Sequence, residues 1–225
     1  GNEFVGMTPV VAEAAVATME VLKSTPMPES DGERHRFRVS TDISTGGIAY
    51  CGQGYAISPE AGATLTRYGS LEIPELDYVM YHGYDGVEVT SLDGLSAVES
   101  EHATALAVWL AIADQRYDVL KYNDSVIGAP EQWFHGNKYY QERYDVTQSE
   151  AVKRAAKKLY DAAMTYKRAG GGGIEEGCAI YWKNTNVITL EGVGRGHWGQ
   201  GLVTASKVRI GNGKCTKKAK HTDWL

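Results

Sequence analysis

The chain has 225 residues, of which 43% are hydrophobic and 23% are charged, and its formal net charge is −5. This length suits one large domain with a substantial buried core. The net charge gives no reason to expect a nucleic-acid partner. No segment is long and apolar enough to cross a bilayer, so we also expect no membrane partner.

The N-terminal part is expected to be mainly extended. Residues 9–22 are compatible with a helix, although their β-branched side chains keep a strand possible. The Pro and polar residues of 25–32 indicate a loop. Residues 36–42 alternate apolar and polar side chains, which predicts a strand. Two glycines then interrupt the chain, and Ile48–Cys51 is the next expected strand, followed by a turn-rich stretch through Gly62.

Three helices are expected in the middle of the chain. The first begins at Pro74, which the first helical turn tolerates, and ends at Gly83. The second covers residues 98–114, and its nine consecutive apolar residues at 105–113 predict burial on nearly all faces. Thr147 and Glu150 have the spacing of a capping box that opens a third helix, which runs to about residue 169.

The remaining segments, 178–183, 187–191 and 202–210, are predicted strands. An order of strands, helices and strands favours an α+β fold, with a β-sandwich or barrel-like lobe that carries an inserted helical lobe. We expect a single domain over residues 1–225. Its β-rich lobe would comprise approximately residues 1–70 and 175–225, and its mainly helical lobe residues 71–174.

Two short motifs stand out. Tyr50 precedes Cys51 at the end of a predicted strand, and Thr104, Ala105 and Trp109 lie on the apolar helix. Over about residues 48–114 the chain resembles the thioester domains of Gram-positive surface adhesins. In that family a Cys after an aromatic residue is joined to the Gln of a Thr-Gln-x-Ala-aliphatic-Trp motif. This chain has each element of the second motif except the Gln, whose place Ala105 takes.

The resemblance implies a surface adhesin that captures host amines through an internal thioester. The expected partner is a host surface or matrix protein that offers a lysine amine, and capture is a single event that requires no enzymatic turnover and no cofactor. The resemblance also implies a secreted protein attached to a Gram-positive cell wall. The chain starts without Met and without a signal peptide, so we expect an excised mature fragment whose anchor lies outside it.

The resemblance also implies an environment for the bond. Trp109 follows position 105 by one helical turn and shares its face, and His102, three residues before it, could also face the site. The expected environment is formed by Tyr50, Tyr55, His102, Thr104 and Trp109.

Ala105 decides what this chain can do at that position. Alanine has no carboxamide, so we expect a thioester-null form. Alanine is also an excellent helix former, so the fold should be retained. Both an engineered Gln→Ala change and a natural loss account for Ala105. The retained helix, Thr104 and Trp109 favour the engineered change.

Two other functions remain open. One is a papain-like cysteine hydrolase with Cys51 as nucleophile and His197 as base. Against it, the Gly and Pro residues after Cys51 indicate a loop, whereas such nucleophiles open a helix that lowers the thiol pKa. The other is a noncovalent carbohydrate- or protein-binding module that uses the 14 Tyr and 5 Trp of the chain. Only the covalent function predicts complexes that survive boiling in detergent.

The three cysteines are an odd number, which in an exported chain suggests one disulfide and one thiol with a separate role. Cys178 and Cys215 are the candidates for the disulfide, although three reduced, buried thiols remain equally compatible with the sequence. The His and Cys residues show no paired ligand spacing, so we expect no metal site.

Overall fold

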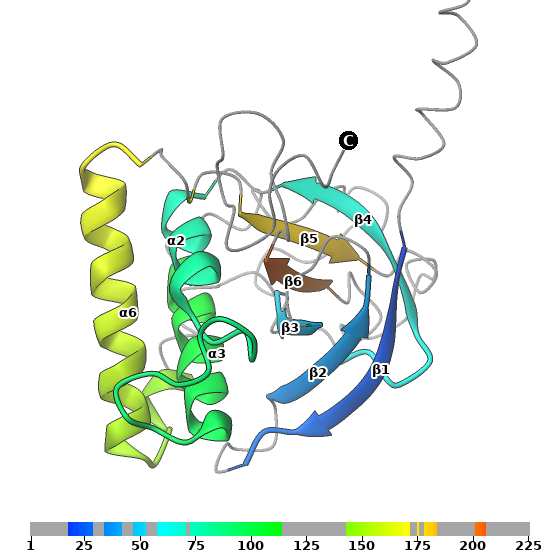
Figure 1. Ribbon diagram of the computed structural model, residues 1–225, viewed down its shortest axis with the longest axis horizontal. Coiled ribbons are helices and arrows are strands. Elements are labelled where there is room, and N and C mark those ends of the chain that lie inside the picture. The colour runs from blue at the N-terminus through cyan, green and yellow to red at the C-terminus, as the bar shows by residue number, and fades with distance from the viewer. Residues whose placement is uncertain are drawn as a thin grey trace, which may run out of the picture.

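The computed structural model describes residues 18–28, 34–41, 47–52, 58–70, 73–113, 143–171, 175, 178–183 and 201–205. In these ranges a closed antiparallel barrel carries a layer of helices on one side (Figure 1). The predicted α+β class, with a barrel-like lobe and a helical insertion, is therefore confirmed.

The barrel combines strands from both ends of the chain. The neighbouring strands follow the order β1-β2-β3-β6-β5-β4, every pair is antiparallel, and β1 pairs with β4 to close the barrel. Strands β5 and β6 thus lie between β3 and β4. The strands are β1 (Thr18–Pro26), β2 (His35–Ser40), β3 (Ile48–Cys51), β4 (Thr64–Ser70), β5 (Ala179–Lys183) and β6 (Gly201–Ala205).

The strand predictions hold for β2, β3 and β5, and β6 occupies the start of the predicted segment 202–210. The helical interpretation is wrong for residues 18–22, because β1 pairs there with both β2 and β4. Strand β1 also extends to Pro26, into the predicted loop. Strand β4 was not predicted, and the predicted strand 187–191 lies outside the described residues.

The helices are α2 (Pro74–His82), α3 (Ala97–Ala113) and α6 (Glu150–Arg168), close to their predicted bounds. The predicted capping box is wrong in its N-cap residue. Ser149 caps α6, and its hydroxyl accepts a hydrogen bond from the Val152 amide at 3.2 Å. The Thr147 hydroxyl instead donates to the Arg143 carbonyl at 2.9 Å, so it serves another contact.

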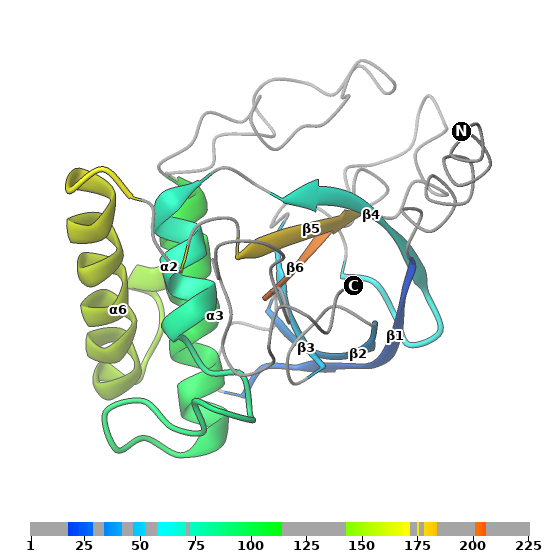
Figure 2. The same cartoon turned by 45° about the horizontal axis from the view of Figure 1, so that its top comes forward.

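Helices α2 and α3 lie between the barrel and α6 (Figures 1 and 2). Alternate residues of the strands face two separate cores. In β5, Ile180 and Trp182 contact the core inside the barrel, whereas Ala179 and Tyr181 contact the core shared with α2 and α3. The wall formed by β3, β6 and β5 is therefore apolar on both faces.

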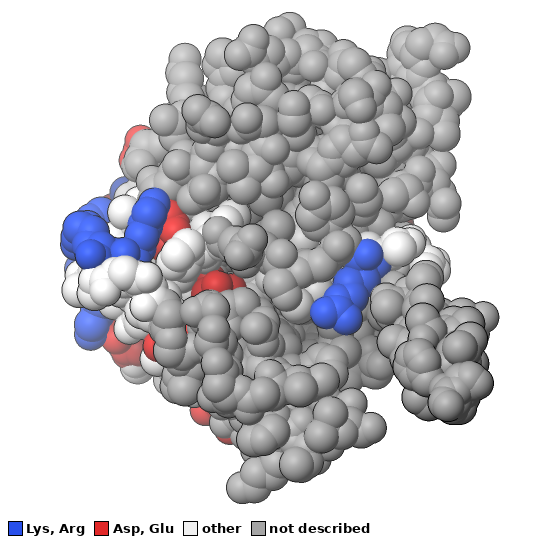
Figure 3. Space-filling view, turned by 90° about the horizontal axis from the view of Figure 1, so that it is seen from above, with Lys and Arg blue, Asp and Glu red and all other residues white. Residues whose placement is uncertain are grey.

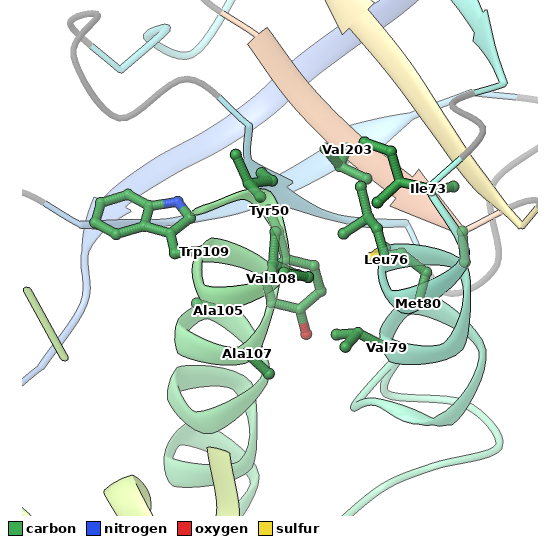
Figure 4. Packing of buried hydrophobic residues seen from close by; sticks show 14 of the residues in the cluster. Tyr50, Ile73, Leu76, Val79, Met80, Ala105, Ala107, Val108, Trp109 and Val203 are labelled. Atoms are coloured by element: carbon green, nitrogen blue, oxygen red, sulfur yellow. The ribbon is translucent and has the colours of Figure 1, made fainter. Parts of the chain in front are cut away.

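Helix α3 is buried on nearly all sides, as its apolar sequence predicts. One face packs on the barrel wall and α2 through residues that include Ala105, Val108 and Trp109 (Figure 4). The opposite face, which includes Ala103 and Leu106, packs against α6. None of the helices in the described ranges combines the length and apolar character that a membrane span needs.

Buried carboxylates fix the helices to the barrel. Glu101 of α3 is 1% exposed and accepts hydrogen bonds at 2.9 Å from both terminal nitrogens of Arg38 and at 3.2 Å from Arg36, both on β2. Asp77 of α2 accepts a hydrogen bond at 2.8 Å from the backbone amide of Ala179 on β5. These contacts fix the position of α2 and α3 along the barrel wall.

Candidate functional site

Cys51 lies where the two cores meet. It is the last residue of β3, carries a thiol and is partly buried. By the alternation of the strand it shares a face with Ala49, which contacts the core inside the barrel. Because the strand ends here, Cys51 packs against the helix-facing core as well.

A hydrogen bond from Trp109 joins the two predicted motifs. The indole Nε1–H of Trp109 donates to the backbone carbonyl oxygen of Cys51 at 2.9 Å. The indole is 2% exposed, so this bond connects α3 to the end of β3 in a largely dry environment. Ala105 lies one turn before Trp109 on the same side of α3 (Figure 4). The structure therefore brings Cys51 and Trp109 together, and Ala105 lies on the helix face that carries Trp109.

Position 105 is buried, with a relative exposure of 7%, and belongs to the core cluster against which Cys51 packs. Its side chain is a single methyl group. The Cys51 thiol therefore has no carboxamide to attack at this position, which is part of an apolar core.

Thr104 and Tyr50 hold the segment after α2 against α3. The Thr104 hydroxyl accepts a hydrogen bond from the Tyr84 amide and donates one to the Ser100 carbonyl, both at 2.9 Å. The Tyr50 hydroxyl donates to the Tyr84 carbonyl at 2.7 Å. Burial raises the pKa of Tyr50 well above its ordinary value, so this phenol remains a neutral donor.

Gly83 is required by this close approach. A Cβ atom there would lie 2.5 Å from the Thr104 methyl group and 2.6 Å from the Val79 carbonyl oxygen. The backbone of Gly83 and Tyr84, directly after α2, therefore packs against the Thr104 side chain of α3. This arrangement gives Thr104 a structural role directly beside position 105.

His102 is 2% exposed and contacts Arg34, whose Nη2 lies 3.1 Å from its Nε2. A guanidinium has only donors, so Nε2 is the acceptor in this bond and carries no proton. Its lone pair is therefore directed at Arg34. His102 is connected to the predicted site through Arg34 and Trp109, which lie in contact.

Sequence reasoning missed Arg34. Its guanidinium is buried between elements that are far apart in the chain, and it lies in a polar, charged segment that reads as a loop or a strand edge. No local pattern distinguishes it from the other charged residues nearby in the sequence.

A second feature that the sequence did not reveal is the pair Gly52 and Gly201. The Gly52 amide donates to the Gly201 carbonyl at 2.8 Å, and the ring of Tyr181 covers both residues. A Cβ on Gly52 would lie 2.8 Å from Tyr181 Cε1 and 2.9 Å from the Val203 side chain, and one on Gly201 would overlap the Tyr181 phenol. The backbone directly after Cys51 therefore accepts only glycine without rearrangement.

Other predicted residues have different outcomes. Cys178 is buried and disulfide-bonded. Tyr55, His197 and Cys215 lie outside the described residues, so the pairing of Cys178 with Cys215 stays a prediction. Within the described ranges no group of three or more His, Cys, Asp or Glu side chains could hold a metal ion.

The exposed charges on the described surface are mixed in sign. Figure 3 shows acidic and basic side chains side by side over the helices, at the left of that view. Several form ion pairs, such as Lys157 with Asp161 at 2.8 Å and Lys158 with Asp93 at 3.3 Å. The described part of this face over the helices therefore presents no field of one sign.

The chain matches no protein-family model and no curated protein. Among solved structures it is similar to the thioester domain of the Enterococcus faecium TIE86 protein, with 18% identity and a TM-score of 0.39 over 74% of this chain and 60% of that one. It is also similar to the pilus-presented adhesin Spy0125 (Cpa), with 12% identity and a TM-score of 0.39 over 84% of this chain and 46% of the adhesin. A mutant of the same adhesin gives 12% identity and a TM-score of 0.40, over 84% of this chain and 47% of the mutant.

The chain thus spans about 60% of the first structure and less than half of the pilus adhesin. At such low TM-scores and identities, the likeness alone does not assign the chain to their family or describe its chemistry.

Proposed function

We propose that this chain is an adhesin domain of the thioester type, in a thioester-null form because Ala105 occupies the position of the bonding Gln. In its parent form the domain would capture a lysine amine of a host protein covalently, at the bacterial cell surface. The observation that carries the proposal is the hydrogen bond from the Trp109 indole to the Cys51 carbonyl at 2.9 Å. This bond holds α3, which carries Trp109, against β3, which carries Cys51.

The proposed chemistry has two steps. In an Ala105→Gln variant, the Cys51 thiol gives up its proton and its sulfur attacks the side-chain carboxamide carbon. A C–S bond forms, the C–N bond breaks, and the nitrogen takes up this proton and leaves as ammonia. An incoming amine then attacks the same carbon, the C–S bond breaks, and an amide forms while the thiol is regenerated. The apolar surroundings of Cys51 favour this sequence because they limit attack by water.

The position of Cys51 also supports acyl capture over a papain-like hydrolase. Cys51 ends a strand and is followed by Gly52, so the N-terminus of a helix does not begin at this residue. A helix N-terminus is the usual means by which such hydrolases lower the pKa of the nucleophile. Loss of a measured peptidase activity in a Cys51→Ala variant would instead favour the hydrolase.

The deciding experiment is the intact mass of the Ala105→Gln variant under denaturing conditions. We expect a mass lower than the calculated value by one ammonia, and after treatment with methylamine a mass higher than that of the thioester form by one methylamine. The same variant with Cys51→Ser should keep its full calculated mass. A folded Ala105→Gln variant with an unchanged mass would contradict the proposal.

A volume control separates chemistry from packing. The Ala105→Leu variant places a side chain of similar size in the same buried position without a carboxamide, and overpacking there should cost roughly 1–3 kcal/mol in both variants. Only Ala105→Gln should form an adduct with a lysine-containing peptide that survives boiling in detergent. An adduct with Ala105→Leu, or with the chain as it stands, would show that the linkage does not involve position 105.

A further inference from the structure

We propose that Arg34 is a positioning residue for the Cys51 site and acts through Trp109. This inference rests on the proposed function. Arg34 directly precedes β2, is 2% exposed and donates hydrogen bonds to three of the described residues. Its Nη2 donates to His102 Nε2 and to the Thr147 hydroxyl, each at 3.1 Å, and its Nη1 donates to the Arg143 carbonyl at 3.3 Å. One side chain thus connects the barrel to α3 and to the segment that leads into α6.

The same guanidinium lies over the ring of Trp109, with 5.7 Å between its central carbon and the ring centroid. This distance is within the range of a cation–π interaction. The nitrogen of the same indole donates to the Cys51 carbonyl. Trp109 is therefore held at two points, by Arg34 at its face and by Cys51 at its N–H.

The cost of this arrangement argues that it has a role beyond packing. A buried guanidinium loses its hydration, which hydrogen bonds and an aromatic face must offset. Apolar side chains of similar volume often fill such positions with equal or better stability. Lysine lacks the planar fork that reaches His102, Thr147 and Arg143 simultaneously. The contacts of Arg34 thus fix the orientation of the Trp109 indole, which donates a hydrogen bond to the Cys51 carbonyl.

The expected role follows from the geometry of acyl transfer. The thiol and the acyl carbon must meet within a narrow range of distance and angle, and a displacement of about 1 Å can cost roughly 100-fold in rate. Position 105 and Trp109 lie on one face of α3, so a rotated indole would let this face shift against the end of β3. Arg34 touches neither reacting atom in this scheme. It contacts α3 through His102 and Trp109, and its proposed effect on the site runs through the indole.

The test uses the Ala105→Gln variant as the reference and compares Arg34→Met and Arg34→Lys in that background. We expect Arg34→Met to slow thioester formation, followed by intact mass after refolding, about tenfold or more, and Arg34→Lys to restore only part of the rate. Arg36→Met is the matched control, because Arg36 also binds α3, through Glu101 at 3.2 Å, while the two bonds from Arg38 to Glu101 still hold the helix in place. It should lower the melting temperature without slowing thioester formation.

A double-variant comparison shows whether Arg34 acts through the indole. Trp109→Phe keeps a ring but removes the N–H, so it should slow thioester formation like Arg34→Met. Combining the two should add little further loss, because both disturb one connection. Losses that multiply in the double variant would overturn the proposed route through Trp109.

The outcomes separate this inference from the proposed function. If the reference forms the thioester and a folded Arg34→Met variant forms it equally fast, Arg34 is not a positioning residue although the proposed function stands. If the reference forms none, the proposed function fails, and the alkylation rate of Cys51 by iodoacetamide in the chain with Ala105 decides the inference. Arg34→Met should change this rate several-fold and Arg36→Met should not. If Arg34→Met does not fold, Arg34→Lys serves in both assays, and an unchanged rate in it overturns the inference.

Discussion

Replacing Thr104 by valine tests the packing beside position 105. Valine keeps the shape of threonine but cannot accept the hydrogen bond from the Tyr84 amide, which is 2.9 Å long and partly buried. Leaving such a donor without its acceptor costs about 1–3 kcal/mol. The bond to the Ser100 carbonyl is also lost, but this oxygen lies within α3 and accepts from the helix backbone. We therefore expect a loss of about 1.5 kcal/mol, which for a domain of this size lowers the melting temperature by roughly 3–6 °C.

Thr104→Ser is the matched control, because it keeps the hydroxyl and removes only the methyl group that lies against Gly83. Thermal unfolding measures the loss of stability, and hydrogen exchange of the Tyr84 amide reports the bond directly. Thr104→Val should accelerate this exchange, whereas Thr104→Ser should leave it slow. Equal exchange in the two variants, or a valine variant as stable as the parent, would refute the role assigned to Thr104.

Three further predictions concern stability and are measured by chemical denaturation. Gly52→Ala should cost about 1–3 kcal/mol, because the added Cβ would lie 2.8 Å from Tyr181, and an unchanged midpoint would show that the ring moves freely. Arg38→Met should cost about 1.5–3 kcal/mol, because it removes charged hydrogen bonds from the buried Glu101, and restoration by Arg38→Lys alone would argue against the forked contact. Burial raises the pKa of Tyr50, so unfolding favours its ionised form and stability should fall as the pH rises above about 10. Phenylalanine at this position should reduce that alkaline loss, and an identical pH profile would contradict the buried phenol.

The helices were predictable because their signals are local. Pro74 and Gly83 mark the bounds of α2, and the apolar run of α3 is long enough to require burial on most faces. Strand β4 has no such signal. Among its described side chains only Leu65 is buried and apolar, and the strand exists because β1 and β5 pair with its two edges. The sequence of β1 is compatible with a helix or a strand, and its pairing with β2 and β4 makes it a strand.

The residues of the candidate site also differ in whether a local sequence pattern predicts them. The resemblance paired the two short motifs that carry Cys51 and Trp109, and a hydrogen bond connects these two residues. Arg34 was not predicted, because its partners His102 and Thr147 lie 68 and 113 residues away in the chain. Arg34 also binds Thr147, which the sequence predicts as the N-cap, whereas Ser149 caps α6 in the structure. Buried polar contacts between distant segments leave no periodic trace in the sequence.

The position of β6 beside β3 has a consequence for the order of assembly. Cys51 pairs with Leu202, so the strand that carries the thiol gains its second neighbour only from the far end of the described chain. Pairings between such distant segments form slowly, because a long loop must close before they contribute stability. During synthesis, the wall around Cys51 can therefore form completely only after the ribosome has made β6. Until then the edge of β3 and the thiol remain open to solvent, so any bond made by this cysteine would be protected only in the finished barrel.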